Sequence, residues 1–477
     1  MAWNAELEAA FYPKAIAIVG VPSDSKRGEV LLGGGLFITA FEQLGFKGHL
    51  YPINPKADEI LGYKTYPTVS SIPEHIDLVI LAMPAKFAPA VLADCAKANA
   101  KNIHMFTAGF EETGEKEGIE LGKQVREIAR LNGLRIIGPN CMGLYVPEAG
   151  VGTFRKLSRK SGNVVFLSQS GGHLNWYAHY GSDYGIYFNK CVSYGNAYMF
   201  DCTDFLEYFE NDPKTKFISI YLEGVKDGTK LQQQVTRINR TRPIVIWKAG
   251  LTPSGARAVS SHTASLAGQE AVWKGFFAQT GAVQVNSLEE MAEVTMAFLC
   301  LKPPKGNRVA VMSQGGGTSV SAADICSREG LEMPPLSQNT QDELKKFISL
   351  AGASIRNPLD TGLIFRDIPV LKLELELVAG DPLIDMIILM PHLDIVGDVT
   401  NELVDYLCDF AKNNAYGKPV VIVFHSFNND RWEAELRAKL KVELANNGVA
   451  VYSSLAAASR ALARFANYYR IQREMAG

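Results

Sequence analysis

Residues 15–20 read AIAIVG, an apolar run that ends in glycine and is followed by a polar loop and then a helical stretch. The run is too short for a buried helix. A strand that is covered on both faces needs an apolar side chain at nearly every position, and this run supplies one. The stretch therefore predicts a buried parallel strand that opens a βα unit.

The same alternation of strand and helix recurs through the first 150 residues. Further short apolar runs lie at residues 49–53, 78–83, 102–107 and 134–137, and helical periodicity spans residues 88–98 and 116–131. Five strands joined by crossover helices form a doubly wound parallel sheet. The sequence predicts an α/β fold that begins with a Rossmann-like domain.

An internal repeat follows. Residues 163–172 read NVVFLSQSGG and residues 307–317 read NRVAVMSQGGG, so each is a strand, a turn of small residues and a helix start. The pairs Asp212-Pro213 and Asp381-Pro382 continue the echo, each before a strand. A duplicated α/β module is indicated, and the predicted domains are 1–150, 160–302 and 306–477.

Composition limits the classes of function. The chain has 477 residues, 47% of them hydrophobic, and its 48 Lys+Arg against 50 Asp+Glu give a net charge of -2. Without a basic stretch, nucleic acid is not an expected partner. The longest apolar runs, such as residues 384–390, fall far short of the roughly 20 residues that cross a bilayer, so no membrane span is expected.

The seven cysteines are scattered, with no CxxC pair, and the N-terminal residues lack a basic and apolar signal pattern. These features predict reduced thiols in a cytoplasmic protein. The eight histidines are dispersed as well, so no metal site is expected.

Ligands of open parallel sheets bind beyond the carboxyl ends of the strands. In the first domain these loops hold small residues, glycines and prolines, and Lys56 could add a charge for a phosphate. The fingerprint G-x-G-x-x-G is missing after Gly20, and residues 54–56, Asn-Pro-Lys, stand where NAD sites carry an acid. A phosphate-bearing ligand other than a dinucleotide is favoured over simple βα turns without a ligand.

Two features of the second domain could carry chemistry. Residues 168–172, Ser-Gln-Ser-Gly-Gly, open a helix and could bind an anion such as phosphate, although serine is also a common helix cap. His262 lies among small and hydroxyl residues, with a helix expected just after it, and is either a nucleophile or a structural histidine. Glu223, at the end of the strand 217–222, could orient it.

At these residues the chain resembles the NDP-forming acyl-CoA synthetases (acetate–CoA ligase, ADP-forming), relatives of succinyl-CoA synthetase. The resemblance covers nearly the whole chain. It implies the α part of such an enzyme, with a CoA-binding domain followed by two flavodoxin-like ligase domains. The motifs that carry it are YPINPKA (51–57), IGPNCMG (137–143), LSQSG (167–171), YLEGV (221–225) and SHTASLAG (261–268).

The resemblance also implies roles for single residues. His262 falls on the phosphorylated histidine, beside Ala264 where the family usually has glycine, and Glu223 falls on the carboxylate that steadies the phosphohistidine. The phosphate-binding helix start falls on Ser168, Ser170 and Gly171. The loops that hold CoA fall on Gly20, Ser23, Lys56, Pro84, Thr107, Gly109 and Asn140.

The activity implied by the resemblance interconverts acyl-CoA, ADP and phosphate with acid, CoA and ATP, through an acyl phosphate and phosphohistidine. A separate ATP-grasp β subunit is expected to bind ADP or ATP with Mg²⁺, so that the protein is a hetero-oligomer. Two alternatives are a CoA-binding, acyl-sensing regulatory protein and a Rossmann oxidoreductase, which the missing glycine fingerprint disfavours. The acyl group, ADP or GDP preference, physiological direction and exact oligomeric state are not determined by the sequence.

Overall fold

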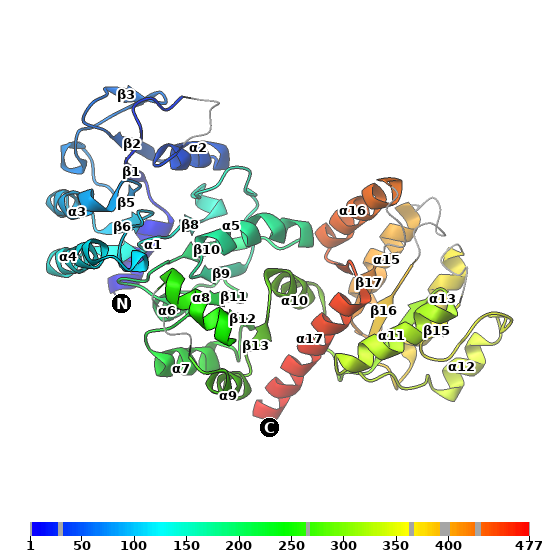
Figure 1. Ribbon diagram of the computed structural model, residues 1–477. Helices are drawn as coiled ribbons and strands as arrows, with labels where there is room; N and C mark the ends of the chain where they lie inside the picture. Colours follow the sequence, from blue (N-terminus) through cyan, green and yellow to red (C-terminus); the bar gives the residue numbers. More distant parts are fainter. Residues whose placement is uncertain are drawn as a thin grey trace. The chain divides into compact units, whose positions relative to one another are not determined.

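The structure is a computed structural model. It describes residues 2–26, 32–263, 268–361, 367–391, 401–424 and 431–476, with the side chains of residues 2–6, 260–263, 401 and 476 outside the description. The chain forms two compact units (Figure 1). Unit 1 comprises residues 1–180 and 187–288, and unit 2 comprises residues 181–186 and 289–477.

The first sheet of unit 1 is parallel throughout and has the strand order β2-β1-β5-β6-β7. Its five strands follow the doubly wound order 2-1-3-4-5, and beside β2 Tyr66 makes an isolated parallel bridge to Ile53. The Rossmann-like prediction is thereby confirmed. The strands are β1 (Ala15–Val19), β2 (His49–Ile53), β5 (Leu78–Leu81), β6 (Asn102–Met105) and β7 (Arg135–Ile137), with a small hairpin of β3 (Glu59–Ile60) and β4 (Tyr63–Lys64).

The opening stretch forms β1, and all five of its residues are buried. It pairs in register from Ala15 opposite His49 to Val19 opposite Ile53. Gly20 follows with a φ of +92°, and a Cβ atom at this position would lie 2.3 Å from the carbonyl oxygen of Ala82. Only glycine allows the chain to leave β1 so close to the end of β5. The helices of this part are α1 (Ala2–Phe11), α2 (Gly35–Leu44), α3 (Ala88–Lys97) and α4 (Lys116–Asn132).

The second sheet of unit 1 has the order β13-β12-β11-β9-β10-β8. Its five parallel strands follow the flavodoxin-like order 2-1-3-4-5, and β8 adds an antiparallel edge to β10. The strands are β8 (Gly143–Tyr145), β9 (Val164–Ser168), β10 (Phe188–Ser193), β11 (Phe217–Leu222), β12 (Ile244–Lys248) and β13 (Val283–Val285). The helices are α5 (Gly171–Tyr180), α6 (Cys202–Glu210), α7 (Gly228–Ile238), α8 (Pro253–Thr263) and α9 (Glu270–Thr280).

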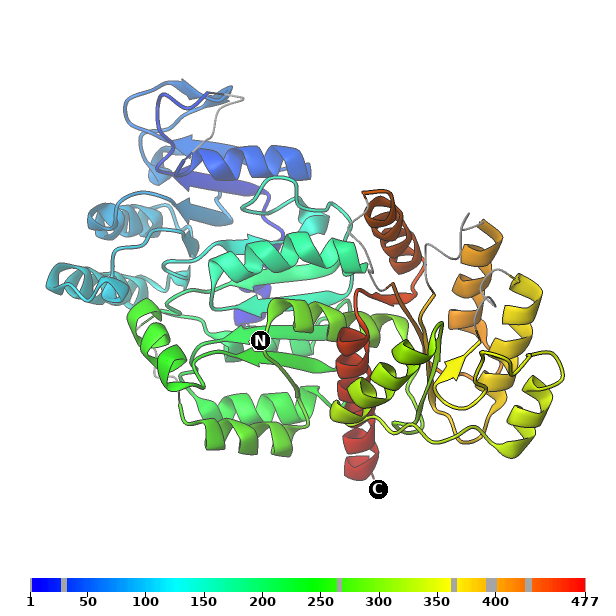
Figure 2. The same cartoon turned by 45° about the vertical axis from the view of Figure 1, so that its right-hand side comes forward.

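One apolar cluster includes residues of both sheets of unit 1, such as Ile16 and Ile80 of the first and Leu167 and Ile220 of the second. Both views show the blue to cyan first sheet beside the green second sheet (Figures 1 and 2). Because burial of apolar surface is the main stabilising term, this continuity fixes the loops of the two sheets relative to each other. A site can therefore form between them.

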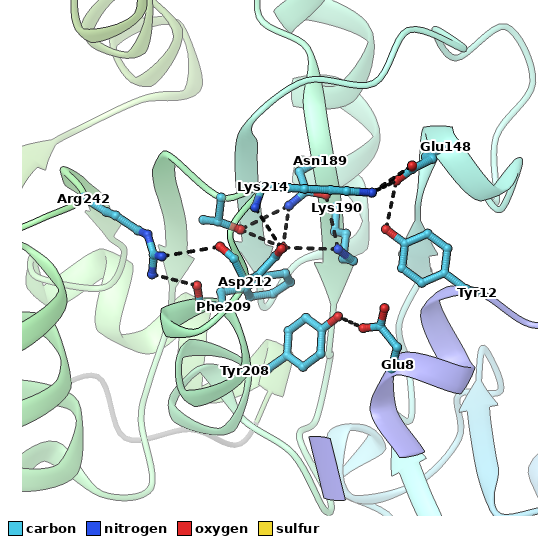
Figure 3. Close-up of polar contacts among 11 residues, drawn as sticks. Glu8, Tyr12, Glu148, Asn189, Lys190, Tyr208, Phe209, Asp212, Lys214 and Arg242 are labelled. Atoms are coloured by element: carbon cyan, nitrogen blue, oxygen red, sulfur yellow. Dashed lines mark hydrogen bonds and ion pairs between the residues drawn. The ribbon is translucent and has the colours of Figure 1, made fainter. Parts of the chain in front are cut away.

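Helix α1 is attached to the second sheet by a cluster of polar contacts around the buried Lys190 (Figure 3). Tyr208 of α6 donates a hydrogen bond to Glu8, and Tyr12 donates one to Glu148 at 3.0 Å. The ammonium group of Lys190 lies 3.2 Å from Asp212 at the centre of the cluster. The N-terminal helix is thus part of the packing of the second sheet.

Unit 2 contains the third sheet, β15-β14-β16-β17-β18, which repeats the flavodoxin-like order 2-1-3-4-5. This agreement confirms the flavodoxin-like fold predicted for the two modules. The strands are β14 (Val309–Ser313), β15 (Leu359–Asp360), β16 (Met386–Leu389), β17 (Val420–Val423) and β18 (Ala450–Tyr452). The helices are α10 (Leu288–Cys300), α11 (Gly316–Arg328), α12 (Gln338–Leu344), α13 (Ile368–Gly380), α15 (Asn401–Asn413), α16 (Arg431–Asn446) and α17 (Leu455–Ala476).

Helix α10 packs with unit 2 through two acidic residues. Glu293 accepts a hydrogen bond from Arg460 of α17 at 3.0 Å, and Glu290 pairs with Arg464. The unit boundary accordingly falls at Leu288, ahead of the coil that links α10 to β14. Within the described ranges, none of the helices is both long and apolar enough to span a membrane.

Candidate active site

A pocket of about 560 Å³ lies in unit 1 where the loops of the first sheet meet the start of α5. The pocket lies beyond the carboxyl ends of β5, β6 and β7 of the first sheet and of β9 and β10 of the second, which is where ligands of open parallel sheets bind. The pocket brings together the predicted residues Pro84, Thr107, Asn140, Ser170 and Gly171. Its other lining residues are Ala82, Met83, Phe106, Ala108, Cys141, Met142, Gln169, Gly172 and Gly195.

The remaining predicted CoA residues lie elsewhere. Gly20 directly follows β1, while Ser23 and Lys56 are exposed on the loops after β1 and β2. The backbone N–H of Lys56 donates to Asn54. Gly109 lies in the loop after β6, and its N–H donates to Glu112 at 2.6 Å. The pocket wall therefore contains only part of the predicted set.

The residues at the start of α5 are small because neighbouring atoms leave little room for side chains there. Gly171 is approached by Met142, whose Cγ atom would lie 2.5 Å from a Cβ atom at that position. The hydroxyl of Ser170 accepts the N–H of His173 at 3.3 Å, so this serine caps the helix. Ser168 is fully buried, and its hydroxyl donates to the carbonyl of Ser170 at 2.6 Å. Of the three predicted phosphate residues, Ser168 thus shapes the turn and does not line the pocket.

Gln169 was not among the predicted site residues, yet it connects the turn before α5 to the loop after β11. Its side-chain oxygen accepts the N–H groups of Glu223 at 2.9 Å and Gly224 at 3.0 Å. The side chain is 5% exposed. The turn that begins α5 therefore holds the loop after β11 directly.

Glu223 is 3% exposed and is held from several sides. The hydroxyl of Tyr221 donates to its Oε1 atom at 3.2 Å, and the ammonium of Lys248 donates to its carbonyl oxygen at 2.7 Å. Burial and the neighbouring carboxylate raise the pKa of Tyr221, so this phenol stays a donor. The site carboxylate consequently occupies a defined position.

A second group of unpredicted residues orders the first-sheet loops. Glu112 accepts the N–H of Gly109 with one oxygen and the side-chain amide of Asn196 with the other, the latter at 2.6 Å. Asn196 in turn accepts the amide of Asn140 at 3.4 Å. The hydroxyl of Thr107 bonds the carbonyl of Met83 at 2.9 Å, so it serves the neighbouring loop. These contacts preorganise the wall of the pocket.

The predicted nucleophile His262 lies near the C-terminal end of α8. The sequence placed it in a loop ahead of a helix, and this expectation is wrong for its backbone. Pro253 is favourable at the first position of a helix, and the alanines that follow sustain the helix. The side chain of His262 and the whole of Ala264 lie outside the described residues.

Comparisons with known proteins agree with this arrangement. Residues 14–147 match the family described as a CoA binding domain, and residues 161–298 match a succinyl-CoA ligase like flavodoxin domain. The chain is 34% identical to the α subunit of acetate–CoA ligase (ADP-forming) II of Pyrococcus furiosus, over 96% of this chain and 97% of that one. It is 37% identical to acetate–CoA ligase (ADP-forming) I of Archaeoglobus fulgidus, over 74% of this chain and 50% of that protein.

A solved structure is similar as well. It is the dinucleotide forming acetyl-coenzyme A synthetase 1 of Ca. Korarchaeum cryptofilum in complex with phosphate and ADP, with a TM-score of 0.83 and 31% identity over 98% of this chain and 97% of that chain.

The two family matches place the chain among proteins with a CoA binding domain followed by a flavodoxin domain of the succinyl-CoA ligase type. The chain belongs to the family of ADP-forming acyl-CoA ligases, which are acid–thiol ligases, and it matches their α subunits. It spans about half the length of the Archaeoglobus relative. The resemblance drawn from the motifs is confirmed, and the regulatory and oxidoreductase alternatives are disfavoured.

Proposed function

We propose that the chain is the α subunit of an ADP-forming acyl-CoA synthetase, in which the pocket of about 560 Å³ holds the thioester of acyl-CoA. The observation that carries the proposal is the meeting of CoA-type loops with a helix N-terminus in that one pocket. The dipole of α5 and its first N–H groups favour a phosphate beside the thioester. In this arrangement the phosphate and the thioester are bound next to each other, so their reaction requires no further encounter in solution.

The reaction proceeds in three transfers. A phosphate oxygen attacks the thioester carbonyl carbon, the C–S bond breaks, and CoA leaves as a thiolate with an acyl phosphate remaining. A ring nitrogen of His262 then attacks phosphorus, and the P–O bond to the acyl group breaks to release the carboxylate. Finally the phosphohistidine passes its phosphoryl group to the terminal phosphate oxygen of ADP, which gives ATP.

Glu223 supports the second transfer because its buried carboxylate can accept a hydrogen bond from the second ring nitrogen of His262. The last transfer requires a nucleotide site, which we assign to a separate ATP-grasp β subunit that binds ADP and Mg²⁺. The relative from Pyrococcus furiosus is itself named a subunit, which supports a hetero-oligomer. All seven cysteines are free thiols, as suits a cytoplasmic enzyme.

The pocket also favours one class of acid. Around it, the side chains that the structure describes carry no charge, and Met83, Phe106 and Met142 supply apolar surface. A second carboxylate on the acyl group would be buried there without a cation, which is costly. We therefore assign a monocarboxylic acyl group, and we expect acetyl-CoA to react and succinyl-CoA to fail.

Mass spectrometry tests the proposal. The chain is incubated with phosphate and either thioester, and the peptide that contains His262 is examined for an acid-labile phosphoryl group. His262→Ala should abolish the label, whereas His75→Ala, which changes a histidine with 64% side-chain exposure, should leave it intact. Absence of the label with every thioester, also after addition of an ATP-grasp partner and Mg-ATP, would refute the catalytic role.

A further inference from the structure

Lys248 is the last residue of β12 and is only 4% exposed. It lies opposite Leu222 in the parallel pairing of β12 with β11, so its position adjoins the loop that begins with Glu223. The sequence motifs drew no attention to this lysine. Its place at the carboxyl end of a strand, however, is where functional side chains of parallel sheets are found.

Lys248 contacts the main chain of Glu223, the residue that carries the site carboxylate. Its ammonium donates to the carbonyl oxygen of Glu223 at 2.7 Å and also to the carbonyl of Ala249. It lies 5.2 Å from the centre of the Trp273 ring, which adds a cation–π contact. Gln169 accepts the N–H of Glu223, so both the backbone N–H and the backbone carbonyl of Glu223 are hydrogen-bonded.

The fold does not require a cation at this position. In the internal repeat, residues 242–248 correspond to residues 418–424, and Trp247 opposite Val285 matches Val423 opposite Tyr452. Lys248 therefore corresponds to Phe424, which is 3% exposed. The same strand end thus accepts an apolar side chain in the third sheet.

Burying a cation is expensive unless it is paired. In the part of the chain that the structure describes, Lys248 bonds carbonyl oxygens and faces a ring but forms no ion pair with a carboxylate. An apolar residue would satisfy the packing at a lower cost, as Phe424 does. The retention of a lysine is consequently better explained by the chemistry beside it than by stability.

We infer that Lys248 is a positioning residue for the phosphoryl transfer proposed above. It fixes the main chain of Glu223 through the carbonyl bond and places a positive charge behind the loop. A phosphoryl group that approaches the Glu223 carboxylate is repelled by it, and the buried ammonium offsets this repulsion. The inference rests on the proposed function, because it assigns a role within that reaction.

The charge of Lys248 is adjustable near neutral pH. Burial lowers the pKa of its ammonium to about 8, while the charge of Glu223 acts in the opposite direction. The residues that face it from the adjoining elements are Glu223 after β11 and the uncharged Trp273 of α9. The ammonium is therefore present below pH 8 and is lost as the pH rises through that value.

The test compares initial rates of labelling of the chain from radioactive phosphate and acetyl-CoA. Lys248→Met should slow the maximal rate on the order of 10²-fold, the cost of removing one preorganised donor, with little change in the KM for acetyl-CoA. Lys248→Arg should restore most of the rate. The matched control is Lys226→Met, because Lys226 also bonds backbone carbonyls, those of Ala197 and Tyr198, and should leave the rate unchanged.

The pH arm separates function from folding. The wild-type rate should fall as the pH rises through about 8, and the fall should move upward in Lys248→Arg, because guanidinium keeps its proton to above about pH 12. The inference would be overturned if the labelling rates of wild type and Lys248→Arg fell at the same alkaline pH. It would also be overturned if a folded Lys248→Met variant kept the wild-type rate, and in both cases the labelling itself would stand. No label on the wild-type chain would overturn the proposed function and this inference together.

Discussion

The side-chain oxygen of Gln169 accepts the backbone N–H of Glu223 at 2.9 Å, across 54 residues of sequence. It accepts the N–H of Gly224 at 3.0 Å as well, so one side chain satisfies two donors at the end of β11. Since Gln169 itself lines the pocket, these bonds connect the pocket wall at the start of α5 to the loop of Glu223. In the proposed reaction this contact keeps the phosphate site and the carboxylate in register.

Gln169→Leu should impair both stability and labelling. The substitution keeps the approximate volume and leaves the buried N–H of Glu223 without an acceptor, at about 1–3 kcal/mol, and the partly buried N–H of Gly224 as well. Thermal denaturation should show the loss, and phosphate-dependent labelling should fall at least about tenfold, as for a misplaced catalytic group. The CoA affinity of the variant, measured by calorimetry, should stay near the wild-type value. A variant that labels at the wild-type rate would contradict this role.

Gly20→Ala should damage the first sheet at the edge of the pocket. The residue has a φ of +92°, and a Cβ atom would lie 2.3 Å from the carbonyl oxygen of Ala82. The left-handed backbone alone costs about 1–2 kcal/mol, and the clash adds to it. We expect a loss above about 2 kcal/mol in chemical denaturation, together with weaker CoA binding.

The matched control for this change is Gly133→Ala. Gly133 has a φ of +61° after α4, and no atom lies within 4 Å of a Cβ placed there. This variant should lose only the backbone term of about 1–2 kcal/mol and should bind CoA normally. If both variants lost the same stability, the contact with Ala82 would not be the cause.

The parallel strands and their order of appearance follow from the sequence because each is a short apolar run. Strands β1 and β5 are buried at every position, and hence on both faces of the sheet, so each needs an unbroken apolar run. The duplicated module was predictable for the same reason, since Ser168 and Ser313 end equivalent strands. Local composition therefore carries most of the fold.

The hydrogen bonds within the site could not be predicted from local composition. Gln169, Glu112 and Lys248 act through partners that the fold brings close, and a glutamine between two serines has no periodic signal of its own. The edge strand β8 is likewise too short to register as an apolar run. The helical backbone at His262 was missed because the two serines before it, Ser260 and Ser261, belong to a residue type that favours caps and turns.

Lys190→Met should destabilise unit 1 strongly. Lys190 is 1% exposed and pairs with Asp212 at 3.2 Å (Figure 3). Its ammonium also lies 5.2–6.0 Å from the ring centres of four aromatic side chains. Removal of the ammonium leaves a buried carboxylate without its partner, at about 3–5 kcal/mol in urea denaturation. Lys214→Met is the control, because its pair with Glu148 is about half exposed and should contribute less than about 1 kcal/mol. Equal losses would contradict the burial argument.

The same pair makes unit 1 sensitive to acid. Burial raises the pKa of Asp212, but the charge of Lys190 and the hydrogen bond from Asn189 outweigh it, and the pKa lies below its ordinary value. A carboxyl with a lowered pKa in the folded state contributes stability above the unfolded pKa of about 3.9 and loses it as the pH falls further. Asp212→Asn should therefore flatten the acid limb of the denaturation curve below about pH 4. A variant with the wild-type slope there would exclude this pair as the cause.

Glu374 gives unit 2 the opposite dependence on pH. The side chain is fully buried in α13, its hydrogen-bond donor is Thr361 at 3.4 Å, and burial raises its pKa to about 8. An unfolded glutamate titrates near pH 4.3, so the folded state holds the proton more tightly. The resulting stability is complete below about pH 4 and is lost as the pH rises towards 8.

Glu374→Gln removes the contribution of this carboxyl to the pH dependence of stability, because the amide is neutral at every pH. The variant should exceed the wild type in stability at pH 8.5, by at most about 5 kcal/mol, and the advantage should vanish near pH 4.5. Thermal denaturation of both proteins between these pH values measures the difference, with Glu402→Gln, a side chain that is 68% exposed, as the control. Parallel stability curves for wild type and Glu374→Gln would show that the buried carboxyl is already ionised in the folded protein.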